Sequence, residues 1–101
     1  MIADTNLDIQ PGDTPGTYVL SGELDMATAP RIAEIPPRRH GAVILDFTHV
    51  TFIDSIGIWA LVNLVRGMDG GTLVIRNASG NVKRTLELVD LADAPGIVLE
   101  E

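Results

Sequence analysis

LDFTHVTFIDSIGIWALVNLVR, residues Leu45–Arg66, predicts a buried strand, a short loop and a helix in succession. The strand begins with the continuous apolar run Val43–Leu45, which is typical of a strand covered on both faces of its sheet. Asp46 ends this run, and Phe52-Ile53 return an apolar pair toward the core. We therefore expect a buried strand over residues 42–47, followed by a loop.

The helix begins at Asp54-Ser55, because both residues are good N-caps and directly precede an apolar segment that extends to Val65. A serine hydroxyl at this place lies at the positive end of a helix, beside backbone N–H groups without intrahelical partners. Such a position tolerates a phosphate well. Ser55 is therefore either a plain helix cap or a regulatory switch.

Composition and charge restrict the class of partner. With 101 residues, the chain is expected to form one domain over residues 1–101. The sequence is 46% hydrophobic but only 4% aromatic, so its core must be aliphatic. Fourteen Asp and Glu against seven Lys and Arg give a formal charge of −7, which disfavours nucleic acid and anionic membranes. A basic protein partner suits this charge better.

Several other classes of function are also disfavoured. There is no cysteine, and neither His40 nor His49 has a second ligand at metal-site spacing, so we expect no cofactor or metal. Ile53 stands two residues before Ser55, so the G-x-S-x-G elbow of a serine hydrolase is absent, and we expect no enzyme activity. No signal peptide is visible, and the longest apolar run, Ile56–Val65, is too short for membrane insertion. We expect a cytoplasmic protein.

The remaining segments alternate between strand and helix patterns. In chain order we expect a hairpin over 5–23; a short helix after Asp25 that contains Met26 and stops at Pro36-Pro37; a strand over 72–75; a helix capped by Ser79; a loop over 90–95; and a strand over 96–99. Strands joined through helices are parallel and right-handed in their crossovers. The sequence therefore predicts a small α/β domain with a mixed sheet of about five strands, the first at an edge, and helices packed on it.

Two stretches resemble the signatures of STAS domains, the family of the anti-sigma factor antagonists. Gly22-Glu23-Leu24-Asp25 resembles the GELD signature of the family. The segment from Leu45-Asp46-Phe47 to Ile58 resembles the second signature, whose centre is Asp-Ser-Ser/Thr-Gly-Leu. Gly70-Gly71 and Val82-Lys83-Arg84 also match in type and order, so the resemblance spans nearly the whole chain.

The resemblance implies a partner switch that regulates transcription indirectly, for example in a stress response. Family members bind an anti-sigma factor that is also a serine kinase. The kinase phosphorylates the serine after the aspartate, here Ser55, which breaks the complex, and a serine phosphatase restores it. Together with the residue pattern, the resemblance leads us to expect a partner-binding surface made of Asp25, Asp54, Ser55, Ile56, Gly57 and Trp59. From residue type alone, Asp25 and Asp54 are also ordinary helix caps.

The chain departs from the family pattern at four places. Ile56 replaces the second hydroxyl residue of the signature, and Trp59 stands where a small residue is usual. The first helix is short, and the chain ends where many members carry a final helix, which we expect to be missing. Trp59 lies off the apolar face of its helix, so it either fills a gap or anchors a partner, and we favour the second interpretation.

An alternative function remains open. The same domain could be a STAS module that is not phosphorylated and acts as a regulatory subunit of a larger assembly, such as a transporter or a stress complex. Both Ile56 and Trp59 are compatible with this alternative.

Overall fold

The computed structural model describes residues 6–89 and 95–100. Five strands, two α-helices and one 3₁₀ helix follow one another in this part of the chain. In order they are β1 (Leu7–Pro11), β2 (Thr17–Leu24), the 3₁₀ helix η1 (Ala29–Glu34), β3 (Ala42–Ile53), α1 (Ser55–Arg66), β4 (Thr72–Arg76), α2 (Gly80–Leu88) and β5 (Ile97–Glu100).

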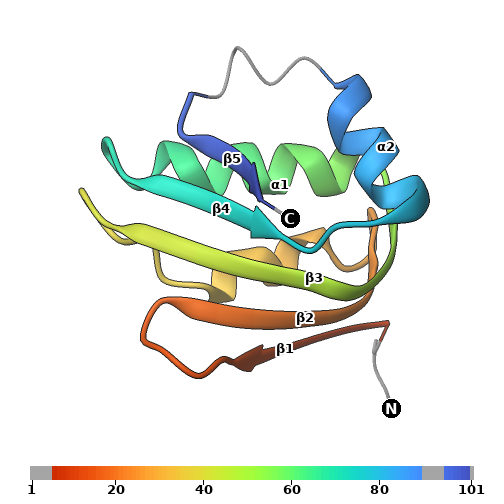
Figure 1. The fold of residues 1–101 in the computed structure, drawn as a ribbon, viewed down its shortest axis with the longest axis horizontal. Helices are drawn as coiled ribbons and strands as arrows, with labels where there is room; N and C mark the ends of the chain where they lie inside the picture. Colours follow the sequence, from red (N-terminus) through yellow and green to blue (C-terminus); the bar gives the residue numbers. More distant parts are fainter. Residues whose placement is uncertain (1–5, 90–94, 101) are drawn as a thin grey trace.

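The strands form one mixed sheet in the order β1-β2-β3-β4-β5 (Figure 1). Strand β1 lies at one edge and pairs antiparallel with β2, whereas the three other pairings are parallel. This confirms the predicted α/β class, the mixed sheet and the edge position of the first strand. Parallel strands end on the same side, so β2 and β3 deliver the segments that follow them to one edge of the sheet.

The helices cover only one face of the sheet. Figure 1 shows α1 and η1 behind the strands, and residues of α2 join the same core as the strand residues that face α1. Val43 and Leu45 are fully buried in this core, but Ile44 points to the other face and is only half-buried. The prediction that the strand is covered on both faces is therefore wrong, because α1, η1 and α2 all lie on one side.

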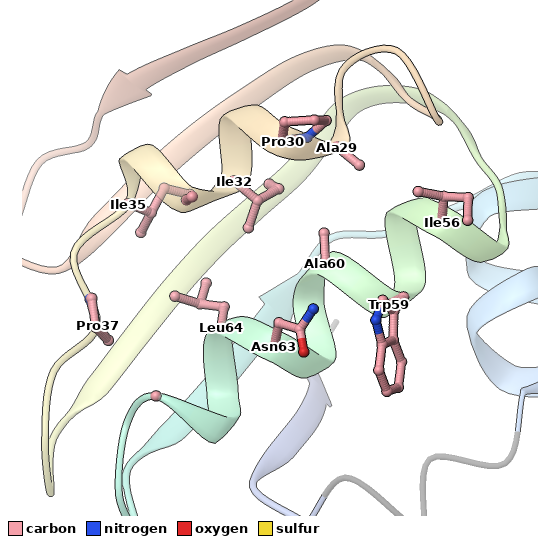
Figure 2. Close-up of a pocket in the computed structure, with 12 residues that line it drawn as sticks. Ala29, Pro30, Ile32, Ile35, Pro37, Ile56, Trp59, Ala60, Asn63 and Leu64 are labelled. Carbon is pink, nitrogen blue, oxygen red and sulfur yellow. The ribbon is translucent and has the colours of Figure 1, made fainter.

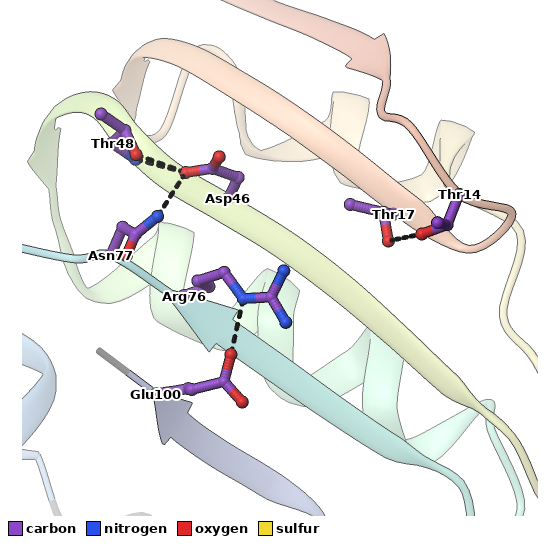
Figure 3. A network of polar contacts seen from close by, with 7 residues as sticks. All are labelled: Thr14, Thr17, Asp46, Thr48, Arg76, Asn77 and Glu100. Carbon is purple, nitrogen blue, oxygen red and sulfur yellow. Dashed lines mark hydrogen bonds and ion pairs between the residues drawn. The ribbon is translucent and has the colours of Figure 1, made fainter.

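Strand β3 continues beyond its predicted end at residue 47. Asp46 does not terminate it, because its carboxylate is satisfied on the open face (Figure 3). It accepts hydrogen bonds from the Thr48 backbone N–H at 2.9 Å, the Thr48 hydroxyl at 2.6 Å and the Asn77 amide at 3.5 Å. Partial burial raises the pKa of Asp46. The hydrogen bonds from Thr48 and Asn77 and the nearby His49 together lower this pKa by more than burial raises it, so the net shift is downward.

Other expectations about the elements need correction. Phe52 does not return to the core with Ile53: it is 47% exposed, because β3 is still extended there and alternate residues face opposite sides. The predicted first helix is a 3₁₀ helix, with Pro30 in its first turn. Ser79 occupies the N-cap of α2 but makes no capping hydrogen bond with its side chain. Of the predicted loop over 90–95, residues 90–94 lie outside the described residues.

Gly57 allows α1 to approach β2 closely. A Cβ added at this residue would lie 2.4 Å from the carbonyl oxygen of Leu24, the last residue of β2, and 3.1 Å from a side-chain carbon of Ile53. Real Cβ atoms do not come this close to a backbone oxygen. The first turn of α1 is therefore seated against the end of β2 through the missing side chain.

This close approach predicts a steric penalty for a methyl group. Gly57→Ala should lower the free energy of unfolding by about 1 to 3 kcal/mol, because the strain exceeds the helix-propensity gain of alanine. Urea denaturation measures this difference. Gly67→Ala, at the other end of α1, is the matched control, since its Cβ would meet nothing nearer than 3.5 Å. Equal stability of the two variants would contradict the packing argument.

Candidate functional site

Ser55 is exposed at the first position of α1, and Asp54 is the N-cap. The Asp54 carboxylate accepts a hydrogen bond from the Gly57 backbone N–H at 2.9 Å. Sequence could not separate the two N-cap candidates, whereas the structure assigns the role to Asp54. Within the described part of the chain, the Ser55 hydroxyl has no hydrogen-bond partner. Its oxygen is therefore free for chemistry.

Asp54 also ties the start of α1 to the loop after β2. Its second carboxylate oxygen accepts from the Met26 backbone N–H at 3.2 Å, and its own N–H donates to the Leu24 carbonyl at 3.2 Å. One side chain thus caps α1 and holds the segment that follows the GELD stretch. Asp54 and Asp25, far apart in sequence, come together at the carboxyl edge of the sheet.

Asp25 stabilises the loop itself. Its Oδ1 accepts from the backbone N–H groups of Ala27 at 2.9 Å and Thr28 at 3.1 Å. It therefore caps the turn at residues 25–28 and not η1, whose N-cap position is Thr28. The buried Thr28 hydroxyl donates to the Glu23 carbonyl at 2.7 Å and accepts from the Asp25 N–H at 3.0 Å. Thr28 was not among the residues predicted from the sequence, although a threonine three residues after an aspartate is a recognisable turn pattern.

Exposed apolar side chains surround Ser55. Met26 is 73% exposed, Trp59 51% and Ile56 45%. Met26 was expected within the first helix, but it precedes η1 and faces solvent. The guanidinium of Arg66 lies 5.1 Å from the centre of the Trp59 ring, a cation–π distance. Trp59 is accessible, as the favoured interpretation of it requires.

Gly57 differs from the other predicted partner-binding residues. Its backbone is buried, so it acts through packing. The structure brings Asp25, Asp54, Ser55 and Ile56 together at the start of α1, and it places Trp59 one turn further along the helix.

An apolar groove of about 390 Å³ lies between η1 and α1 (Figure 2). Ile32, Ile35 and Leu64 form its buried floor, while Ile56, Trp59 and Ala60 line it toward the start of α1. The groove could not be predicted from the sequence, because it depends on the distance between two separate elements.

In residues 6–89 and 95–100, no three His, Asp or Glu side chains are placed to hold a metal ion. None of the helices described is long and apolar enough to cross a membrane.

The comparison with protein families matches the STAS domain over residues 5–100. The chain belongs to the STAS domain family. Among solved structures, this STAS domain is similar to the anti-sigma factor antagonist SpoIIAA in its unphosphorylated form, with a TM-score of 0.60 and 18% sequence identity. The match covers 94% of this chain and 87% of that one, and it shows a shared fold. No curated protein matches significantly.

The double role of Asp54 predicts a loss of stability on truncation. Asp54→Ala should lower the free energy of unfolding by about 1 to 2 kcal/mol, because the cap of α1 and the acceptor for Met26 are both lost. Asp54→Asn keeps one carbonyl acceptor and should lose less. Urea denaturation of both variants tests this, and an unchanged midpoint for Asp54→Ala would refute it.

Proposed function

We propose that this STAS domain is an anti-sigma factor antagonist that is switched off by phosphorylation of Ser55. The exposed hydroxyl of Ser55 at the first turn of α1 carries the proposal. It lies beside the Asp54 cap and the loop held by Asp25. The family membership and the fold shared with SpoIIAA support it.

Phosphorylation would change the surface chemistry at the start of α1. A phosphate on Ser55 adds about −1.5 to −2 charges beside Asp54, in a chain whose formal charge is already −7. The free N–H groups of the first helical turn offset part of this charge. Because Asp54 and Gly57 fix this turn on the sheet, the phosphate opposes the partner at the contact surface and needs no refolding.

The proposed partners are two. An anti-sigma factor with serine kinase activity binds the surface around Ser55 and supplies the ATP, and a serine phosphatase removes the phosphate. The domain acts in the cytoplasm as a binding module without enzyme activity or a cofactor of its own. The kinase contacts Asp25, Asp54, Ile56 and Trp59. Gly57 supports this surface through the close packing of α1 against β2.

A second candidate function is a STAS module that is not phosphorylated and serves as a subunit of a larger assembly. The exposed Ile56 beside Ser55 favours it, because an apolar residue there suits a permanent interface. The fate of Ser55 in the presence of a kinase separates the two functions.

Ser55 should be the only phosphorylated residue. We expect the chain to gain one phosphate when it is incubated with Mg-ATP and the anti-sigma factor kinases encoded near the gene of this protein. Intact-mass spectrometry measures the gain. Ser55→Ala should remain unmodified. If no kinase gives an adduct that depends on Ser55, the switch is refuted.

Two substitutions of Ser55 should differ in their affinity for the kinase. Ser55→Asp places a charge on the contact surface and should weaken the complex, whereas Ser55→Ala should bind nearly as well as the unmodified chain. Isothermal calorimetry with the same kinase measures both. Equal affinity would mean that charge at this position does not control binding.

Trp59 should be an anchor of the interface. Trp59→Ala should weaken kinase binding about tenfold or more, because exposed tryptophans are frequent hot spots. Val98→Ala is the control, since Val98 is 46% exposed on the open face of the sheet. If Trp59→Ala binds as tightly as the unmodified chain, Trp59 does not contact the partner.

A further inference from the structure

The groove between η1 and α1 extends the Ser55 surface. Ile56 and Trp59 belong to both, so a partner that covers Ser55 reaches the mouth of the groove. The lining of the groove runs along α1 from Ile56 to Gly67, about 16 Å at 1.5 Å per residue. This length corresponds to about three turns of a second helix.

Local sequence explains why the groove is open. Ala60 and Gly67 present little side-chain volume, and Ala60 points toward η1 (Figure 2). On the other side, η1 is a six-residue 3₁₀ helix with prolines at and beyond its ends, so it covers only part of the apolar side of α1.

The walls of the groove restrict the type of occupant. Both flanking elements are helical, and the backbone groups of a helix hydrogen-bond within it. An extended peptide in the groove therefore has no strand of η1 or α1 to pair with. The lining is apolar except for Asn63 and backbone groups. Such a groove fits the apolar face of an amphipathic helix, whose side chains at i, i+3 or i+4 and i+7 enter it.

Charge determines which helix would fit. Asp54 is the N-cap of α1, two residues before Ile56 of the groove lining, and it is hydrogen-bonded to the loop that Asp25 holds; the formal charge of the chain is −7. A second copy of this chain would carry the same charge and be repelled. A helix with a lysine or arginine at the end near Asp25 is complementary in both charge and hydrophobicity.

We propose that an amphipathic helix of the anti-sigma factor kinase lies in this groove, with a basic residue near Asp25 and Asp54. This rests on the proposed function and names the contact that phosphorylation disrupts. Ser55 directly precedes Ile56 of the groove lining, so a phosphate on it would lie at the edge of this helix and lose part of its hydration. One basic residue already paired with existing carboxylates does not compensate for burying a doubly charged group.

Two substitutions that fill the groove test the proposal. Ala60→Phe places a ring in it, and Asn63→Lys adds a charge at an exposed position where folding is not at risk. Both should weaken binding of the kinase that phosphorylates Ser55 by about tenfold or more in isothermal calorimetry. Ala42→Phe and Ala42→Lys are the matched controls, because Ala42 is exposed on the opposite face of the sheet; they should stay within about twofold.

Each outcome decides the proposal. Weaker binding by both groove variants, with circular dichroism unchanged, supports it. If Asn63→Lys binds as tightly as the unmodified chain while Ser55 is still phosphorylated, the groove helix is refuted and the proposed function stands. If no kinase modifies Ser55, the proposed function is refuted, and the groove helix that rests on it is refuted with it. If the unmodified chain dimerises by light scattering and Asn63→Lys abolishes this, the occupant is a second copy and the proposal is overturned.

Discussion

The carboxylate of Asp54 is the interaction on which the site depends. It accepts one hydrogen bond from the first turn of α1, at Gly57, and one from the loop after β2, at Met26. The missing side chain of Gly57 lets these two segments approach closely enough for one carboxylate to reach both. Ser55, between Asp54 and Gly57, is thereby presented on a fixed turn, and among residues 6–89 and 95–100 its hydroxyl has no hydrogen-bond partner. The groove beside it begins at the same turn.

The sequence predicted the features that follow from hydrophobic period and local chemistry. The bounds of α1 were predicted at residues 55–66, because the apolar segment is strongly periodic and lies between capping residues and glycines. The mixed sheet followed from the opening hairpin together with the alternation of strands and helices after it. The GELD stretch and the segment around Asp54 indicated the family, since two signatures with the right elements between them are more specific than either alone. The resemblance also brought Asp25 next to Ser55.

Features that depend on tertiary placement could not be predicted. The run Val43–Leu45 is as apolar as that of a strand covered on both faces, and only the helix positions show that Ile44 faces the open side. Met26 fits a helical stripe but precedes η1, because Asp25 and Thr28 close a turn first. The groove depends on how far a short 3₁₀ helix stands from α1, a distance that no local pattern encodes.

The placement of Ser55 within α1 has a consequence for substrate recognition. Its backbone is helical and its neighbour Asp54 is engaged on both oxygens, so the residue cannot be drawn out as an extended strand without breaking the cap. A kinase that acts on it must accept a serine in helical geometry and read residues from β2, the following loop and α1 at once. Under the proposed function, recognition would therefore be conformational: the folded domain would be the substrate, and a linear peptide of the same sequence would not.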